Sequence, residues 1–230
     1  MVSLKINFFL YYMFNKEALE EIVRVHPGSF PAKKLLDNFH LFEQIFHVLN
    51  GKWIHGCGSY LIKGLEYKYY PGMLKKQEEL YRYAMSANNV LEVGVYLGHS
   101  LLLMLLANPN LTITAIDYDN TYAEPVIRFF NRIFGERITF IHSDAIKGLE
   151  TLSLNQYDLI HIDADHNDAA VTAQFNACLP LAKKNCIFVF DDYDAVSTTI
   201  NKLFDDNILE KVIIPDSDYR NCVTRLKSSK

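Results

Sequence analysis

The stretch LEVGVYLGHS, residues 91–100, decides the fold of this chain. A short apolar run leads into it and an apolar helical pattern follows it, so it predicts the turn from a buried strand into a helix. Gly94 and Gly98 let the backbone of such a turn bend tightly and approach a ligand closely. The two glycines stand four positions apart and Glu92 precedes the first, unlike the dinucleotide pattern GxGxxG. A pyrophosphate favours bare amides at a helix N-terminus, so a zwitterionic amino acid suits this acidic loop better.

On both sides of this turn, after residue 88, apolar runs alternate with helical patterns. The strands are expected at Val90–Val93, Thr112–Ile116, Ile138–Ile141, Leu159–Ile162 and Ile187–Phe190. The helices are expected at Ser100–Ala107, Ala123–Phe134, Ala145–Leu152, Ala169–Leu181 and Ala195–Phe204. Such alternation predicts an α/β fold with parallel strands and right-handed crossovers. Two last runs, Lys211–Ile214 and Cys222–Leu226, flank a turn at Asp216–Asp218 and predict an antiparallel C-terminal hairpin. The expectation is a Rossmann-like, doubly wound, mostly parallel sheet of seven strands.

The first part of the chain has a different character. Helical signals dominate it. A helix is expected at Lys16–Val25, where Asn15 could cap it, and another at Met73–Met85. Between them, the residues from Leu35 to Leu49 form an apolar helical face. We therefore divide the chain into an N-terminal helical cap, residues 1–70, and a main domain, residues 71–230. Aromatic side chains of the cap either line an acceptor site or pack against the sheet or a second copy, and the sequence leaves both open; they are Trp53, Tyr60, Tyr67, Tyr69 and Tyr70.

Composition excludes several classes of protein. Of the 230 residues, 50% are hydrophobic and 22% are charged, which is typical of a globular protein. The net charge of −4 does not favour nucleic-acid binding, and no apolar run approaches the ~20 residues of a membrane span. The N-terminus lacks the pattern of a signal peptide, and the four cysteines form no CxxC pair. We expect a cytoplasmic protein with reduced thiols and a small-molecule ligand; a homodimer is left open.

An acid stands at the carboxyl end of each of the five expected parallel strands. Ligands of such sheets bind beyond those ends. A single acid there is as readily explained by a turn or a helix cap. Together and in order, Asp117 and Asp144 indicate a nucleoside, because Asp117 has nearly the spacing at which an acid binds ribose hydroxyls.

These motifs resemble those of a known family. The chain resembles the class I S-adenosylmethionine-dependent methyltransferases in three motifs: ExGxxxGxS at residues 92–100, the acid after the second strand, and Ser143-Asp144-Ala145 after the third. The resemblance extends from about residue 70 to the end of the sequence. LEVGVYLGHSLL is similar to the metal-dependent O-methyltransferases of the catechol and caffeoyl-CoA type. The resemblance implies S-adenosylmethionine as cofactor. It places Asp117 at the ribose, Asp144 and Ala145 at adenine, and four residues at the methionine end: Glu92, Gly94, Tyr96 and Ser100. Gly98 and Asp163 are also predicted to bind the cofactor.

Three further acids are expected to converge after the fourth and fifth strands, namely Asp163, Asp191 and Asp192. Like charges repel, so one acid is protonated, a basic side chain intervenes, or a divalent cation binds. No Lys or Arg lies in either loop, which favours Mg²⁺ (or Mn²⁺ or Ca²⁺) with these three ligands. The resemblance agrees, and the Asp-Asp-Tyr form is similar to the macrocin-type sugar O-methyltransferases.

His166 follows in the same loop, where catechol-type enzymes have a lysine base. We predict His166 and Asp163 as the catalytic residues, with His166 as the base rather than a solvated loop histidine, because its reference pKa suits proton transfer at neutral pH. Asp165 is expected to cap the following helix. The predicted activity is methyl transfer to a hydroxyl of a vicinal diol, sugar or catechol. The alternatives are a nicotinamide-dependent oxidoreductase, disfavoured by the missing GxGxxG, and a non-catalytic cofactor-binding module.

Overall fold

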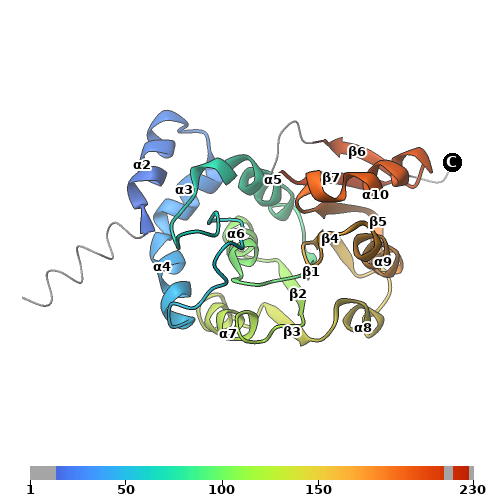
Figure 1. The fold of residues 1–230 in the computed structure, drawn as a ribbon, viewed down its shortest axis with the longest axis horizontal. Coiled ribbons are helices and arrows are strands. Elements are labelled where there is room, and N and C mark those ends of the chain that lie inside the picture. The colour runs from blue at the N-terminus through green and yellow to red at the C-terminus, as the bar shows by residue number, and fades with distance from the viewer. Residues whose placement is uncertain (1–13, 215–219, 228–230) are drawn as a thin grey trace, which may run out of the picture.

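A seven-stranded sheet forms the centre of the molecule (Figure 1). The computed structural model describes residues 14–214 and 220–227. The strands are β1 Asn89–Val93, β2 Thr112–Asp117, β3 Ile138–His142, β4 Tyr157–Ile162, β5 Ala182–Phe190, β6 Leu209–Ile213 and β7 Cys222–Leu226, in the order β3-β2-β1-β4-β5-β7-β6. Strands β1 to β5 are parallel, whereas β7 is antiparallel to both β5 and β6. The predicted sheet and its C-terminal hairpin strands are thus confirmed; the predicted turn at 216–218 lies outside the described residues, as do residues 1–13.

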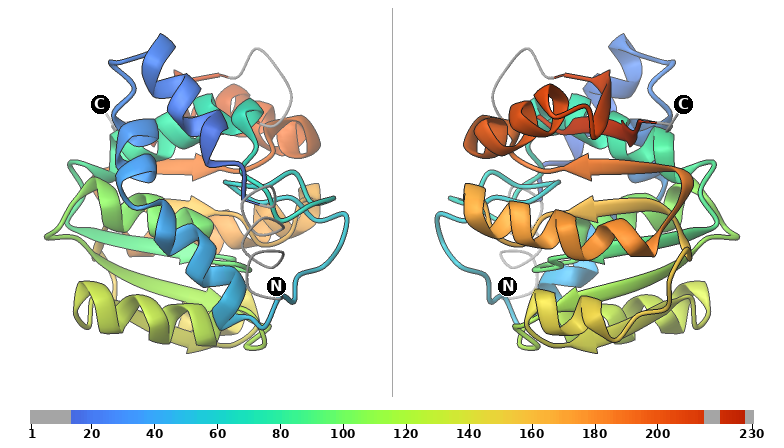
Figure 2. Two further views of the ribbon diagram at one scale, coloured as in Figure 1. Left: turned by 90° about the vertical axis from the view of Figure 1, so that its left-hand side faces the viewer. Right: turned by 90° about the vertical axis from the view of Figure 1, so that its right-hand side faces the viewer.

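Helices cover both faces of the sheet. On one face lie α6 His99–Ala107 and α7 Ala123–Phe134, and on the other α8 Ala145–Glu150, α9 Asp168–Cys178 and α10 Tyr193–Asp205 (Figures 1 and 2). Two apolar clusters fill these layers, and successive residues of a strand alternate between them: Val90 belongs to the first cluster and Leu91 to the second. This alternation follows from the period of two of a strand.

The N-terminal helices extend the first of these layers. They are α2 Lys16–Val25, α3 Phe30–Asp37, α4 Phe39–Val48 and, after the short 3₁₀ turn η1 Pro71–Met73, α5 Leu74–Ala84. Helix α5 packs on α6, α3 on both, and α4 on α7. Residues of the expected cap therefore share one apolar cluster with the sheet. Among its aromatics, Tyr67 and Tyr69 are buried in packing, with Tyr67 stacked on Phe42 at 5.0 Å between ring centroids.

The apolar face from Leu35 to Leu49 is buried as predicted, but two helices carry it. They are separated at Asn38, whose side chain donates to the carbonyl of Lys34 at 2.9 Å and competes with the helix. The predicted cap at Asn15 is wrong. Asn15 has a left-handed backbone conformation, with φ of 59°, and its side chain makes no cap hydrogen bond to α2. No helix in the described part of the chain combines the length and apolar character needed to cross a membrane.

The strand order places a ligand site. The chain runs outward from β1 to β2 and β3, and then returns to the other side of β1 with β4 and β5. The loops after β1 and β4 thus leave the sheet toward opposite faces. A crevice at such a switch point, at the carboxyl ends of the strands, is where open α/β sheets bind ligands.

Candidate functional site

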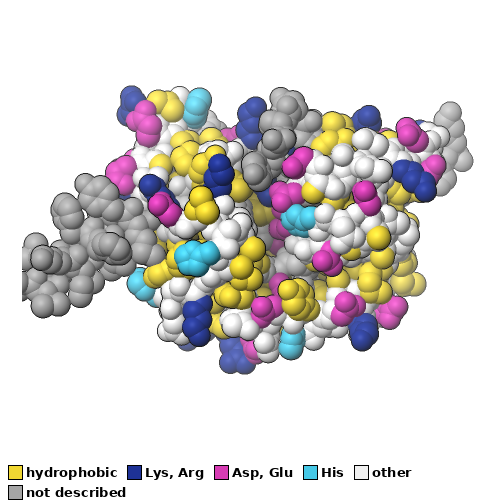
Figure 3. Space-filling model, viewed as in Figure 1, with side chains coloured by type: hydrophobic (Ala, Val, Ile, Leu, Met, Phe, Trp, Pro, Cys, Tyr) yellow, Lys and Arg dark blue, Asp and Glu magenta, His cyan; other side chains and the backbone are white. Residues whose placement is uncertain are grey.

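A cavity of about 620 Å³ opens at this switch point and is bordered by the loops after β1, β2, β3, β4 and β5. Residues 54–63, which belong to the cap, close its other side. Its volume falls in the range of small-molecule sites, about 300–1,000 Å³. Acidic and histidine side chains gather at a hollow in the middle of the face shown in Figure 3. The cavity thus joins both groups of acids predicted from the sequence.

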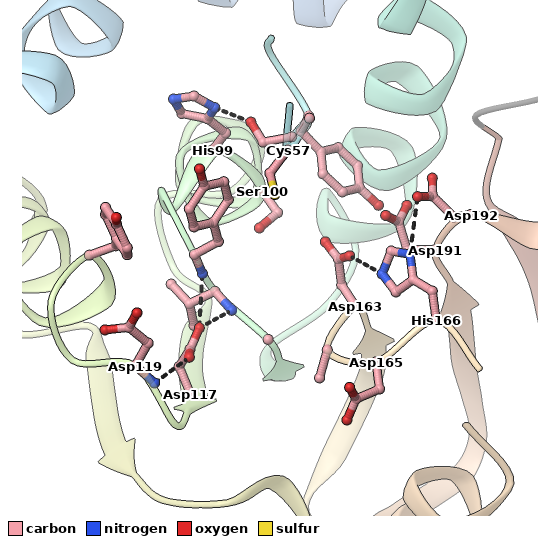
Figure 4. Close-up of a pocket in the computed structure, with 18 of the residues that line it drawn as sticks. Cys57, His99, Ser100, Asp117, Asp119, Asp163, Asp165, His166, Asp191 and Asp192 are labelled. Atoms are coloured by element: carbon pink, nitrogen blue, oxygen red, sulfur yellow. Dashed lines mark hydrogen bonds and ion pairs between the residues drawn. The ribbon is translucent and has the colours of Figure 1, made fainter. Parts of the chain in front are cut away.

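Asp117 organises one end of the cavity. Its Oδ2 accepts hydrogen bonds from the backbone amides of Val95 and Tyr96 at 2.8 and 2.9 Å, and its Oδ1 accepts from the amide of Asp119 at 2.8 Å (Figure 4). A carboxylate offers about four acceptor positions, so room remains for a ligand hydroxyl. Asp117 therefore holds the first loop in shape and still faces the cavity, and Asp119 lines it as well, a residue that sequence reasoning missed.

The two glycines of the first loop have different roles. Gly94 lines the cavity with φ of +93°, and a Cβ there would overlap the carbonyl of Asp163. Gly98, with φ of +69°, is not among the cavity-lining residues; a Cβ on it would lie 2.7 Å from Cγ1 of Val126 in α7. Gly98 thus permits helix packing, whereas Gly94 lets the first loop touch the loop after β4. Tyr96 has a positive φ of 49°, which stores strain at the cavity wall.

Glu92 lies behind the cavity rather than in its wall. It is fully buried, accepts a hydrogen bond from Ser100, and its Oε2 lies 3.2 Å from Nδ1 of His161. Burial lowers the pKa of His161, but the charge of Glu92 outweighs it and raises this pKa to about 9. The hydroxyl of Tyr60 lies 2.7 Å from Nε2 of His161 and donates to Asn221 at 2.8 Å. A buried polar chain therefore runs from β1 through β4 to the cap and to the residue before β7, and two of its members, Ser100 and Tyr60, line the cavity.

Asp144 and Ala145 both line the cavity on the side of β3. Asp144 also caps α8, because its Oδ1 accepts from the amide of Lys147 at 3.2 Å. The two explanations considered for this acid, a helix cap and a ligand contact, are compatible. Asp165, in contrast, does not cap α9: Asn167 does, with its Oδ1 3.0 Å from the amide of Ala170.

His166 bridges two acids at the opposite end. Its Nε2 lies 3.3 Å from Asp163 and its Nδ1 3.1 Å from Asp192 (Figure 4). These contacts with Asp163 and Asp192 raise the pKa of His166 to about 10, and burial, reinforced by the charge of Asp191, raises the pKa of Asp163 to about 7. The imidazole is thus charged at neutral pH in this state, and Asp163 is the member of the pair with room for a proton.

Sequence reasoning missed the basic side chain that enters this end. Lys76, in the first turn of α5, is buried, and its Nζ lies 2.6 Å from Oδ1 of Asp191 and 3.1 Å from Oδ1 of Asp192. Burial lowers the pKa of Lys76, but the carboxylates of Asp191, Asp192 and Asp163 outweigh it and raise it. The sequence left three ways to offset the repulsion between the converging acids: a protonated acid, an intervening basic side chain or a divalent cation. In the described residues, a basic side chain intervenes. No local pattern could have indicated it, since 115 positions separate Lys76 from Asp191.

A divalent cation does not fit the acids in this arrangement. Asp163, His166 and Asp191 have ligand atoms close enough together to share an ion. However, Nζ of Lys76 contacts both oxygens of Asp191, at 2.6 and 2.8 Å, where Mg²⁺ would need ligands at about 2.0–2.1 Å. Asp192 is engaged by Lys76 and His166 together. The predicted metal site at Asp163, Asp191 and Asp192 thus requires that Lys76 leave.

Comparison with known proteins first defines the class. Residues 91–193 match a family model described as a methyltransferase domain. This segment runs from β1 to the start of α10 and contains every predicted cofactor and acid-site residue. The predicted methyltransferase domain is thereby confirmed over these residues.

Individual relatives agree with this class. A protein of Arabidopsis thaliana, provisionally named a caffeoyl-CoA O-methyltransferase, is 34% identical over 110 residues, which are 47% of this chain and 47% of that protein. Tapetum-specific methyltransferase 1 of the same plant is 33% identical over 123 residues, 51% of this chain and 52% of that protein. The match therefore spans about half the length of these relatives.

Solved structures share the fold at low sequence identity. The O-methyltransferase of Bacillus cereus in complex with S-adenosylhomocysteine superposes with a TM-score of 0.59 at 14% identity, covering 82% of this chain and 91% of that one. The O-methyltransferase TomG of Streptomyces achromogenes, in complex with S-adenosylmethionine, gives a TM-score of 0.56 at 17% identity, covering 66% and 79%. At these identities the likeness establishes the Rossmann-like fold.

Proposed function

We propose that the protein transfers the methyl group of S-adenosylmethionine to a hydroxyl of a small molecule. One observation carries this proposal: a single cavity joins the loop of Gly94, Tyr96 and Asp117 to the cluster of Asp163, His166 and Asp191. The first set has the polar groups that a nucleoside and an amino acid require. The second set can receive the proton that a hydroxyl loses. The names of the matched relatives support the same reaction type.

The cofactor would lie across the switch point. Asp117 would accept hydrogen bonds from the ribose, and Asp144 and Ala145 would contact adenine from the side of β3. The methionine end would lie at Gly94, Tyr96 and Ser100. Glu92 and Gly98 act from behind the wall, Glu92 by holding Ser100 and Gly98 by letting α6 approach α7.

The reaction is an in-line displacement, so positioning carries much of the catalysis. The acceptor oxygen forms a bond to the methyl carbon while the bond from carbon to sulfur breaks, and the sulfur keeps that electron pair. The hydroxyl proton passes to the Asp163–His166 pair. Hydroxyls of vicinal diols, sugars and catechols suit this end, because it presents carboxylates and an ammonium group to them. No step requires a metal ion.

Binding and turnover test this proposal separately. We expect calorimetry to detect S-adenosylhomocysteine and to detect no NAD. Methyl transfer from labelled S-adenosylmethionine to a panel of diols, sugars and catechols should fall by about 10²-fold or more in Asp163→Asn, the usual size of acid–base catalysis. Asp194→Asn, an exposed acid of α10 outside the cavity, is the matched control and should retain the wild-type rate.

Two outcomes would contradict the proposal. Binding of NAD in preference to S-adenosylhomocysteine would favour the oxidoreductase alternative. Tight binding of S-adenosylhomocysteine without turnover of any acceptor would favour the non-catalytic module.

A further inference from the structure

Lys76 is a buried cation whose position the proposed reaction does not by itself explain. Its side chain is 3% exposed, yet it lines the cavity together with Asp191 and Asp192. A lysine is rarely buried unless it is paired. Here it is paired with both acids of the loop after β5, which are two of the three acids that the sequence assigns to a divalent cation.

The surroundings of Lys76 fix its ammonium group. Nζ lies 4.7 Å from the centre of the Tyr60 ring, a cation–π contact. The backbone carbonyl of Lys76 accepts a hydrogen bond from Asn221 at 3.2 Å, and the next residue, Gln77, donates to the carbonyl of Tyr60 at 2.8 Å. These bonds tie the first turn of α5 to the cap and to the residue before β7. Lys76 therefore enters the cluster from a fixed backbone rather than from a loose surface segment.

Lys76 and a divalent cation would compete for the same oxygens. Both oxygens of Asp191 lie within 2.8 Å of Nζ. An ion at coordination distance from Asp191 would meet the ammonium group, and two positive charges so close repel strongly in a buried site. Oδ1 of Asp191 is buried and makes no directed hydrogen bond, so the ammonium group of Lys76, 2.6 Å away, is the positive charge that compensates it.

We propose that Lys76 is the resident cation of this site and replaces a divalent metal, so that methyl transfer by this protein is metal-independent. This inference rests on the proposed function. The ammonium group neutralises part of the charge of the three acids and keeps Asp191 oriented toward the acceptor. An acceptor then needs one hydroxyl at the Asp163–His166 pair, rather than two oxygens arranged to chelate an ion.

Metal binding tests this inference without turnover. The paramagnetic resonance signal of free Mn²⁺ is followed while the full chain is titrated, for the wild type, Lys76→Met and Lys75→Met. Lys75 is the exposed neighbour of Lys76, so its substitution removes the same charge outside the cluster. We expect no saturable site in the wild type or Lys75→Met. Lys76→Met should gain one saturable site, with an affinity at least about tenfold above any residual Mn²⁺ binding by the wild type, because a repelling charge is gone. Circular dichroism checks the fold of each variant, and Lys76→Gln replaces Lys76→Met if that variant does not fold.

Each result decides the proposal. One Mn²⁺ bound by the wild type and lost in Asp191→Asn would overturn it, and so would a folded Lys76 variant that binds no Mn²⁺. Turnover of the wild type that a chelator lowers more than twofold would also contradict it. Binding of S-adenosylhomocysteine is measured on the same samples. If the wild type does not bind it, the proposed function is refuted. The Mn²⁺ titration tests only the role of Lys76.

Discussion

Gly94 shows how one residue without a side chain determines the site. Its positive φ and its contact with the backbone of Asp163 bring the loops after β1 and β4 together. We expect Gly94→Ala to lower the free energy of unfolding by more than about 2 kcal/mol, since the backbone strain of about 1–2 kcal/mol is joined by a steric overlap. Urea denaturation measures this loss, and affinity for S-adenosylhomocysteine should fall with it.

Gly135 is the matched control for this substitution. It has φ of +81°, at the end of α7, and a Cβ there would meet nothing within 4 Å. Its ψ of 166° lies in a region that glycine alone adopts readily, so Gly135→Ala should cost only the backbone strain, about 1–3 kcal/mol, and leave ligand affinity unchanged. Equal losses in both variants would show that the contact with Asp163 contributes nothing.

His99 makes stability depend on pH at the residue scale. It is buried, its Nδ1 contacts the hydroxyl of Ser59, and Nε2 lies 2.9 Å from the hydroxyl of Tyr67. Burial lowers its pKa from 6.5 to about 3. Below pH 6.5, His99 is protonated in the unfolded chain but stays neutral in the folded chain, so the free energy of unfolding falls as the pH falls toward 3.

From pH 7 to pH 5 this histidine should cost about 2 kcal/mol of unfolding free energy, at about 1.4 kcal/mol per pKa unit. His99→Gln should remove that part of the pH dependence, and the exposed His26→Gln should not. Urea denaturation at the two pH values measures the difference. If His99→Gln and the wild type lost equal stability on acidification, His99 would not be a buried neutral group.

At the scale of elements, local pattern predicts the parts that local chemistry controls. Helix α2 and helix α7 have the predicted bounds, and all seven strands overlap their predicted positions, since each has its own apolar period and boundary signals. Strand β5 begins at Ala182, earlier than predicted, because its first part, Lys183 to Asn185, is polar and carries no apolar period. The acids at the strand ends were predicted for the same local reason. Lys76 was not, because its partners belong to a different element far along the chain.

The N-terminus of α9 offers a test at this scale. Asn167 accepts a hydrogen bond from the amide of Ala170, while Asp165, which the sequence favoured as the cap, lies two residues earlier. Asn167→Ala should lower the unfolding free energy by about 1 kcal/mol, the usual cost of losing a cap. Asp165→Ala should change it by less than about 0.5 kcal/mol, as at most surface positions. Thermal or urea denaturation distinguishes them, and a larger loss in Asp165→Ala would restore the original assignment.

For the whole molecule, the cavity exists because two regions meet that the sequence separates. The sheet supplies its acids, whereas residues 54–63 of the cap close it. Only the helical character of the cap was predictable. Its arrangement against α6 and α7 depends on packing between distant segments, and the same packing buries Tyr67 and leaves Tyr60 in the cavity wall. The choice left open for the cap aromatics therefore has a different answer for each ring.

Tyr96, in the first loop, forms hydrogen bonds to the part of the cap that closes the cavity. The hydroxyl of Tyr96 accepts a hydrogen bond from the amide of Ile54 at 2.7 Å and donates to its carbonyl at 3.4 Å. Tyr96→Phe removes both bonds and keeps the ring, which packs against Tyr122 at 5.3 Å. Because two half-exposed bonds contribute little to global stability, the unfolding free energy should change by no more than about 2 kcal/mol.

The local effect of Tyr96→Phe should be larger than the global one. Amide hydrogen exchange should accelerate in residues 52–58, where the loop loses its anchor, and not in α6 or β1. The affinity for S-adenosylhomocysteine should fall as well, since the loop that closes the cavity is less often in place. Tyr83→Phe in α5, outside the cavity wall, controls for loss of a hydroxyl. Unchanged exchange in residues 52–58 would mean that other contacts, such as the bond from Gly56 to Gly64 at 2.5 Å, hold the cap loop without Tyr96.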